Sequence, residues 1–329
     1  MKQERITIFL YTFAFLQLLS LSPASAKSEQ PKHSEKKVRS AIERSIPYLE
    51  QKGVEWMREK KCVSCHRIGN MVWTLSEARK YGFSTSEKLD GWIDWSLAAS
   101  MKTNDKGKIV GLGNKEGVAQ LVLGLNDLDE EKRQGLVDLL KQDQESNGSW
   151  KAGGQLPAQK RPPAETKETS TMWIALALQN HSPAAFEKAL DYLNSPLGKS
   201  TEWITLKLLL ARQTKNLNAV KGFTELLLKK QNGDGGWGWL TNEQSDALAT
   251  GMALYALRSV GSESHSTSIL KAEQFLLSHQ KKDGSWDVHS TKKKKRDSIE
   301  ETANYWGTAW AILGLIKGLE KIKKPAPQN

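Results

Sequence analysis

A seven-residue pattern that occurs three times constrains the fold of this chain more than any other feature. It reads Gln-x-x-x-Gly-x-Trp and occupies residues 144–150, 231–237 and 280–286. Each copy follows an amphipathic run that ends in leucines, and each precedes, after a loop, a second run rich in Ala and Leu. Because apolar residues recur at helical spacing in both runs, the repeating unit is predicted to be a helical hairpin.

The spacing of the copies predicts six such hairpins. The first pattern begins 87 residues before the second and the second 49 before the third, so a degenerate unit is expected between the first two. Residues 186–213 supply its two helical runs, and two earlier units occupy residues 38–83 and 87–126. The second helix of each pair is apolar on most faces, which is typical of an inner helix packed on both sides.

Two arrangements of six hairpins were weighed. An open solenoid of the tetratricopeptide kind has a period of about 34 residues, which is shorter than the spacing seen here. Six outer helices around six inner helices can instead close into a ring that hides the inner faces. The sequence therefore predicts an all-α chain forming a single α6/α6 toroid over residues 38–322, with flexible segments at residues 27–37 and 323–329.

A family resemblance supports the closed ring. The helix followed by the Gln-Trp pattern, as in AEQFLLSHQKKDGSW, resembles the QW motif of squalene-hopene cyclases, which protein prenyltransferase β subunits share more loosely. The resemblance covers nearly all of the chain after its N-terminal segment, is strongest over residues 130–320, and implies an α6/α6 toroid. It also implies that the Gln and Trp side chains stabilise the junctions between helices and bind no ligand.

Neither activity of these families carries over. The cyclases protonate their substrate with a DxDD motif, and the nearest string here, Asp-Leu-Asp-Glu at residues 127–130, lacks the last Asp. It lies at the start of an outer helix, where acidic residues complement the helix dipole. The prenyltransferases need an Asp, Cys and His zinc set, and both cysteines of this chain belong to another motif.

That other motif is CVSCH at residues 62–66, and its cysteines, Cys62 and Cys65, are the only two in the chain. CxxCH is the attachment string of c-type haem, in which two thiols bind the porphyrin and the next histidine ligates the iron. A redox disulfide or half of a zinc site are the alternative interpretations. The string predicts one covalent haem c, with His66 as the proximal iron ligand.

The function predicted from this string depends on the sixth iron ligand. In the first hairpin CVSCH takes the place of the Gln-Trp turn, which predicts a haem at the mouth of the ring. Met101 and His289 are the candidate sixth ligands, with an exposed loop residue as the alternative for each. A six-coordinate iron favours electron transfer to a redox partner protein, the function ranked first. An open iron favours a haem-dependent oxidative enzyme acting on an isoprenoid-like or other hydrophobic small molecule in the cavity.

Two further sets of residues are candidates for the lining of that cavity. The first set comprises tryptophans on predicted inner helices, which either line a cavity or fill the core: Trp73, Trp173, Trp203, Trp306 and Trp310. The second set lies near the starts of the inner helices and consists of acid–base groups or helix caps: Glu168, Glu202, Asp246, Glu301 and Asn304.

The N-terminus and the net charge bear on the compartment and on partners. A basic start with Lys2 and Arg5, an apolar run at residues 6–22 and a small-x-small site predict a signal peptide cleaved after Ala26, and hence a periplasmic or secreted protein. No later segment is predicted to span a membrane. The net charge of +11 includes KKKKR at residues 292–296. Because the protein is predicted to be exported, nucleic-acid binding is not expected. Residues 292–296 are expected to form a solvated loop or to dock an acidic partner.

Overall fold

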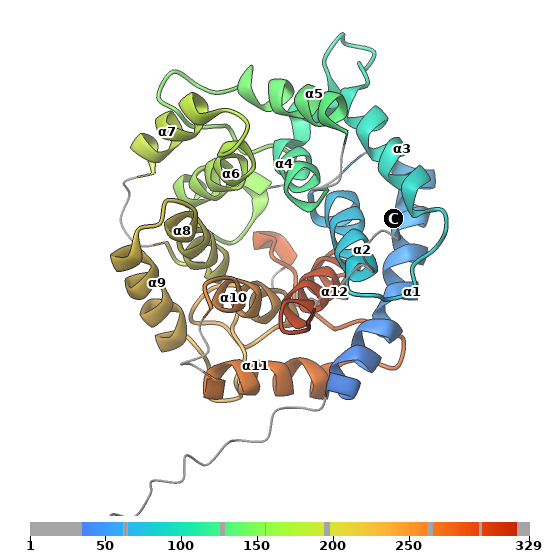
Figure 1. Cartoon of the computed structure of the whole chain (residues 1–329), viewed down its shortest axis with the longest axis vertical. Coiled ribbons are helices and arrows are strands. Elements are labelled where there is room, and N and C mark those ends of the chain that lie inside the picture. Colours follow the sequence, from blue (N-terminus) through green and yellow to red (C-terminus); the bar gives the residue numbers. More distant parts are fainter. Residues whose placement is uncertain are drawn as a thin grey trace, which may run out of the picture. The chain divides into compact units, whose positions relative to one another are not determined.

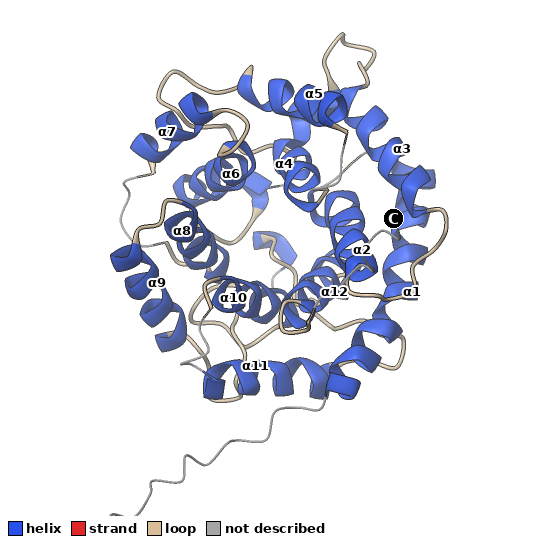
Figure 2. Cartoon of the chain, viewed as in Figure 1, coloured by secondary structure: helices blue, strands red, loops and turns tan. Residues whose placement is uncertain are grey.

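The computed structural model of the chain describes residues 35–61, 63, 65–125, 129–154, 156–193, 198–261, 266–295 and 298–320. Within these ranges it contains twelve α-helices and no β-strand (Figure 2). The helices form an outer and an inner ring, in which each inner helix follows an outer one along the chain (Figure 1). The predicted all-α toroid of six hairpins is therefore confirmed.

The outer ring consists of α1 (Glu35–Lys60), α3 (Leu89–Met101), α5 (Glu130–Lys141), α7 (Pro183–Tyr192), α9 (Leu217–Lys229) and α11 (Ser266–His279). The inner ring consists of α2 (Asn70–Lys80), α4 (Lys115–Gly124), α6 (Pro163–Leu178), α8 (Thr201–Gln213), α10 (Ala247–Ser259) and α12 (Glu301–Ile316). A short π-helical turn, η1 (Cys65–Gly69), precedes α2.

The two rings differ in burial as their sequences predict. In α12 every residue from Ala303 to Ile316 is buried, whereas α9 fully buries only Thr224 and Leu227. A helix that is apolar all round needs neighbours on every side, and the inner ring supplies them. The outer helices, by contrast, cover the inner ring with one face and present the other to solvent.

The Gln-Trp pattern joins neighbouring hairpins. In the last copy, Trp286 Nε1 donates to the Leu276 carbonyl at 2.8 Å, which closes the end of α11. Gln280 Nε2 donates to the Gly284 carbonyl at 3.2 Å and to the Ala41 carbonyl of α1 at 2.8 Å. This last bond joins the final outer helix to the first one, so the third copy of the pattern closes the ring.

The other two copies repeat this geometry. Gln144 reaches the Ala185 carbonyl of α7, and Gln231 reaches the Ser268 carbonyl of α11, both at 2.9 Å. The glycine of each pattern has a positive φ of 83° to 91°. A Cβ at Gly284 would lie 2.0 Å from the Arg44 carbonyl oxygen, so only glycine fits this close approach. The resemblance therefore assigned the motif correctly, as a structural junction.

No helix within the described ranges is both long and apolar enough to cross a membrane. The predicted signal peptide, residues 1–26, and the predicted C-terminal tail, residues 323–329, lie outside those ranges. Cleavage after Ala26 accordingly stays a prediction from the sequence.

Candidate ligand site at the mouth of the inner ring

The six inner helices begin at the same end of the ring, and the loops before them meet there. The Thr201 amide at the start of α8 donates to the Trp239 carbonyl, in the loop before α10, at 3.0 Å. The Lys160 amide, before α6, donates to the Thr291 carbonyl, before α12, at 2.8 Å. These bonds gather the first turns of the inner helices around one opening, which we call the mouth.

An aromatic cluster fills the centre of the inner ring. Trp73, Trp173 and Trp310 come from α2, α6 and α12, and their ring centroids lie 5.6 to 6.2 Å apart. Tyr255 of α10 meets Trp310 edge-on, with centroids 5.6 Å apart. Each tryptophan is at most 4% exposed, so these three rings are packed against one another as a hydrophobic core.

A buried ion pair lies directly above this cluster. The Trp173 indole Nε1 donates to Glu202 Oε1 at 2.9 Å, and Arg161 Nη1 donates to the other oxygen of the same carboxylate. Both side chains of the pair are fully buried. An isolated charge at this depth would be costly, and each partner balances the other.

Glu116, at the start of α4, is a second carboxyl group in the same layer. It is 3% exposed and accepts a hydrogen bond from the Ser170 hydroxyl of α6. Burial, and then the nearby charge of Glu202, raise the pKa of Glu116 to about 7. Near neutral pH this group therefore exchanges between its protonated and ionised forms.

Two more tryptophans separate the charged layer from the mouth. The Arg161 guanidinium carbon lies 5.3 Å from the centroid of the Trp239 ring, and Trp239 lies 5.2 Å from the ring of Trp306. Asp246 fixes this arrangement, because it accepts from the Trp239 amide at 2.9 Å and caps α10 through the Ala249 amide at 2.8 Å. Burial raises the pKa of Asp246 to about 6.

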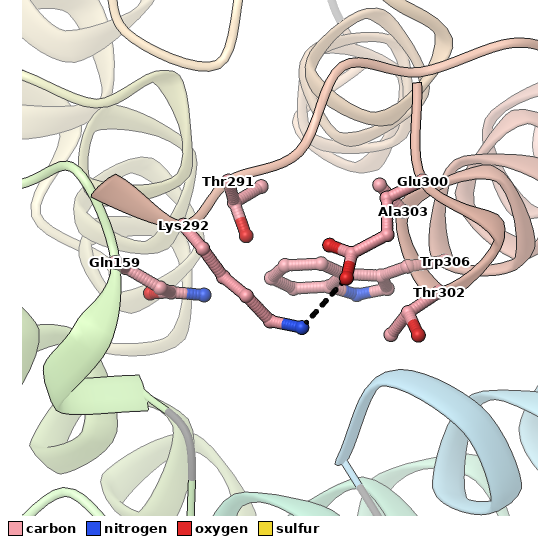
Figure 3. Close-up of a pocket in the computed structure, with 7 residues that line it drawn as sticks. All are labelled: Gln159, Thr291, Lys292, Glu300, Thr302, Ala303 and Trp306. Carbon is pink, nitrogen blue, oxygen red and sulfur yellow. Dashed lines mark hydrogen bonds and ion pairs between the residues drawn. The ribbon is translucent and has the colours of Figure 1, made fainter. Parts of the chain in front are cut away.

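A small pocket lies beside Trp306 (Figure 3); its cavity volume is about 20 Å³, enough for about one water molecule, and it opens to solvent. Its lining residues are Gln159, Thr291, Lys292, Glu300, Thr302, Ala303 and Trp306. Lys292 Nζ pairs with Glu300 Oε1 at 2.9 Å, and the Ser290 hydroxyl donates to the other oxygen at 2.7 Å. Burial alone would raise the pKa of Glu300, but the bonds from Lys292 and Ser290 hold it below its usual value.

Four buried polar atoms along this path have no hydrogen-bond partner among the described residues. They are Arg161 Nε and Nη2, Trp239 Nε1 and Gln159 Oε1. Gln159 lines the pocket, and the contacts of Trp306 with Trp239 and of Trp239 with Arg161 lead inward from it. Leaving a buried polar atom unpaired costs about 1–3 kcal/mol. Three donors and one acceptor are thus available to a ligand or to water.

The predicted acid–base residues have separate roles. Asp246 is a helix cap, as one alternative held, and Glu202 belongs to the buried ion pair. Glu168 accepts from the Trp203 indole, and Asn304 Oδ1 accepts from the Val288 amide, both at 2.7 Å. Glu301 pairs with Arg67.

The Asp-Leu-Asp-Glu string was interpreted as structural, and Asp129 acts in that way. Its side chain caps α5 by accepting from the Glu131 amide at 2.8 Å. The neighbouring positions 127 and 128 lie outside the described residues.

The sequence analysis missed four residues of the site: Glu116, Gln159, Arg161 and Trp239. One local signal for Arg161 was available. It stands directly before Pro162 and Pro163, just ahead of the inner helix α6, where a charged side chain that turns inward needs a buried partner. The other three have no comparable local signal.

The predicted haem residues fall largely outside the described structure. Cys62 and the side chains of Cys65 and His66 are not among the described parts of the chain. Met101 ends α3, is 43% exposed, and has its Cε near Gly135 of α5. His289 is exposed and forms a backbone bridge with Ile299. Their assignment as iron ligands stays a prediction.

Comparison with known proteins agrees with the fold. Residues 206–327 match the family model of the squalene-hopene cyclase C-terminal domain. A type II terpene cyclase from Scytonema, solved with geranylgeranyl dihydroxybenzoate, has a TM-score of 0.55 at 11% identity, with 86% of this chain and 97% of that one covered. The C-terminal part of the chain thus resembles that cyclase domain, and the chain as a whole has the fold of an α/α toroid.

Other toroids share the architecture. A glycosyl hydrolase family 88 protein from Bacteroides vulgatus has a TM-score of 0.62 at 9% identity, and the match covers 87% of this chain and 99% of that one. A polysaccharide lyase has a TM-score of 0.61 at 11% identity, and the match covers 87% of this chain and 97% of that one. No curated protein sequence matches this one. At these identities the likeness establishes the fold alone.

These comparisons correct the function predicted from CVSCH. The solved toroids are named for carbohydrate processing or terpene cyclisation, and none of the three is named as a haem protein. The electron-transfer module and its alternative, a haem-dependent oxidative enzyme, are therefore wrong as predictions. The error lay in deriving the function from five residues while treating a scaffold of about 300 residues as a passive support. Whether haem c is attached is a separate question, because the attachment residues lie outside the described structure.

Proposed function

We propose that this toroid binds a carbohydrate at the mouth of its inner ring. The observation that carries the proposal is the set of four unpaired buried atoms leading inward from the Trp306 pocket. Ligand sites combine apolar and aromatic walls with a few fixed polar groups, and the surroundings of this small pocket have both.

A hydroxylated ligand matches the unpaired atoms. Arg161 and Trp239 offer N–H groups that need an acceptor, whereas Gln159 Oε1 needs a donor. A hydroxyl group supplies both from one atom, and a sugar carries several on a ring whose C–H face packs against an indole. Glu202 already balances the charge of Arg161, so the part of the ligand that faces Arg161 needs no charge of its own.

The names of two structurally similar enzymes accord with this proposal. One is a glycosyl hydrolase and the other a polysaccharide lyase, and both have the toroid as nearly their whole chain. They support sugar as the ligand class, and the polar atoms of this chain supply the independent reason.

Cleavage of the bound carbohydrate is a second candidate function, favoured by Glu116. A carboxyl group with a pKa near 7, beside a second carboxylate, is suited to general acid–base catalysis. A ligand that reached past Trp239 would meet this pair.

The test is a binding measurement on a panel of oligosaccharides, by isothermal titration calorimetry and tryptophan fluorescence. Gln159→Ala should weaken binding about tenfold, because the acceptor that fixes a ligand hydroxyl is removed. Gln213→Ala is a matched control, since Gln213 also has an unpaired buried Oε1 but ends α8, at the opposite end of that helix. Absence of binding to every sugar, or equal loss in both variants, would contradict the proposal.

We also propose that the protein acts outside the cytoplasm, on the strength of the predicted signal peptide at residues 1–26. Mass spectrometry of the mature protein tests cleavage after Ala26. The same spectrum would show a haem adduct on Cys62 and Cys65 if one is present, and carbohydrate binding depends on neither outcome.

A further inference from the structure

A run of four lysines forms the lip of the Trp306 pocket. Lys292 lines the pocket itself, and Lys293–Lys295 follow as a single turn of 3₁₀-helix. The last three are exposed to solvent. We call residues 292–295 the lysine turn.

The lysine turn has a defined position relative to the pocket. Lys292 forms a backbone bridge with Gln159, which also lines the pocket, and the Lys160 amide donates to the Thr291 carbonyl at 2.8 Å. Within the turn, the Lys295 amide donates to the Lys292 carbonyl at 3.2 Å. The cations are therefore held on a backbone that is joined to the pocket wall.

The charge of the lysine turn is only partly balanced. Lys292 and Lys295 share one carboxylate, Glu300, at 2.9 and 3.5 Å. Within the described part of the chain, Lys293 and Lys294 have no ion-pair partner, so four lysines and one glutamate leave a local excess of three positive charges. The whole chain is also basic, with a net charge of +11. An anion approaching the mouth is attracted by both.

We propose that the carbohydrate bound at the mouth is acidic: a sugar ring lies over the opening of the Trp306 pocket, and a carboxylate or sulfate on a neighbouring unit lies on Lys293 and Lys294. This inference rests on the carbohydrate proposal and names its substrate class. A hydroxyl group that points into the pocket can bond to Gln159, whereas the lysine turn can bind an anion just outside it. A single acidic oligosaccharide presents both along one chain.

The experiment compares three trisaccharides of the same linkage by calorimetry: a galacturonic acid trimer, its carboxyl-reduced neutral counterpart and a sulfated galactose trimer. The acidic ligands should bind more tightly than the neutral one at 50 mM NaCl, and this advantage should shrink at 500 mM. Whichever acidic trimer binds more tightly identifies the anion as carboxylate or sulfate.

Charge-removing variants locate the effect. The double variant Lys293→Gln/Lys294→Gln should weaken binding of the acidic trimer about three- to tenfold and change binding of the neutral trimer by less than twofold. Lys221→Gln/Lys229→Gln on α9 removes the same charge from the outer ring and should leave both unchanged.

The outcomes separate this inference from the carbohydrate proposal. If the neutral trimer binds and the acidic ones bind no more tightly, the inference alone fails. Equal loss for neutral and acidic ligands in the lysine variant also overturns it. Acidic polymer binding that survives Gln159→Ala would mean that the lysine turn attracts polyanions, such as acidic proteins, without the pocket. If no sugar binds at all, both proposals fail.

Discussion

The Gln-Trp junctions and the mouth of the inner ring use the same residue types but satisfy them differently. At the junctions, Gln280 Nε2 and Trp286 Nε1 both donate to backbone carbonyls. At the mouth, Gln159 Oε1 and Trp239 Nε1 are buried without a partner in the described structure. A buried polar group that is paired within the fold serves the fold, whereas an unpaired one close to a pocket is available to a ligand or to water. The two regions should therefore respond in opposite ways to mutation.

The largest effect is expected at a junction. Trp237→Ala removes a fully buried ring and its bond to the Leu227 carbonyl, so the free energy of unfolding should fall by about 4 kcal/mol. Urea unfolding followed by circular dichroism measures this change. A loss below about 1 kcal/mol would mean that the junctions contribute little to the stability of the ring.

The next effect concerns Glu116 and depends on pH. The unfolded chain releases this proton near pH 4.5 and the folded chain only near pH 7, so the folded state binds more protons in between. Stability due to Glu116 therefore falls as pH rises through this window, by up to about 3 kcal/mol.

Glu116→Gln tests this pH dependence, because the amide cannot ionise. The difference in unfolding free energy between variant and parent should shift in favour of the variant as pH rises from about 4.5 to 7. Asp246, whose pKa is raised to about 6, titrates in the same range. Its contribution cancels because Asp246 is present in both the variant and the parent. Parallel stability profiles would contradict the raised pKa.

A pair of glutamine variants compares the two regions directly. Gln280→Ala breaks bonds to both Ala41 and Gly284 at the point where the ring closes, and should cost about 1–3 kcal/mol. Gln159→Ala removes an acceptor that has no partner among the described residues, so its free energy of unfolding should fall by less than that of Gln280→Ala while ligand binding weakens. The reverse order of stabilities would refute the distinction between junction and mouth.

The smallest effect isolates single indole N–H groups. Trp237→Phe keeps a buried ring but loses the bond to the Leu227 carbonyl, at a cost of about 1 kcal/mol beyond the change in packing. Trp239→Phe has no such bond to lose, so thermal unfolding should show the smaller destabilisation for this variant. Equal losses would indicate that the size of the ring alone matters.

The prediction of the architecture succeeded because its signals are local. Helical periodicity and the Gln-x-x-x-Gly-x-Trp spacing can each be seen within one repeat. Six hairpins whose inner helices are apolar have few arrangements that bury those helices. The prediction of function failed because CVSCH is also local, and a short motif alone says nothing of the chemistry around it. Asp246 is a further local success, because its role as a helix cap could be predicted from its position directly before α10.

By itself the sequence determined the hairpins, their number and the residues that join them, because each depends on contacts a few residues or one repeat apart. Only the tertiary structure decided the composition of the mouth. Arg161 meets Glu202 across 41 positions, and Gln159 pairs with Lys292 across more than a hundred. These partners lie together because the ring closes and its inner helices all begin at one end, which no local pattern encodes. Closure also decides which unpaired polar atoms lie close to the pocket, and so where we expect a ligand to bind.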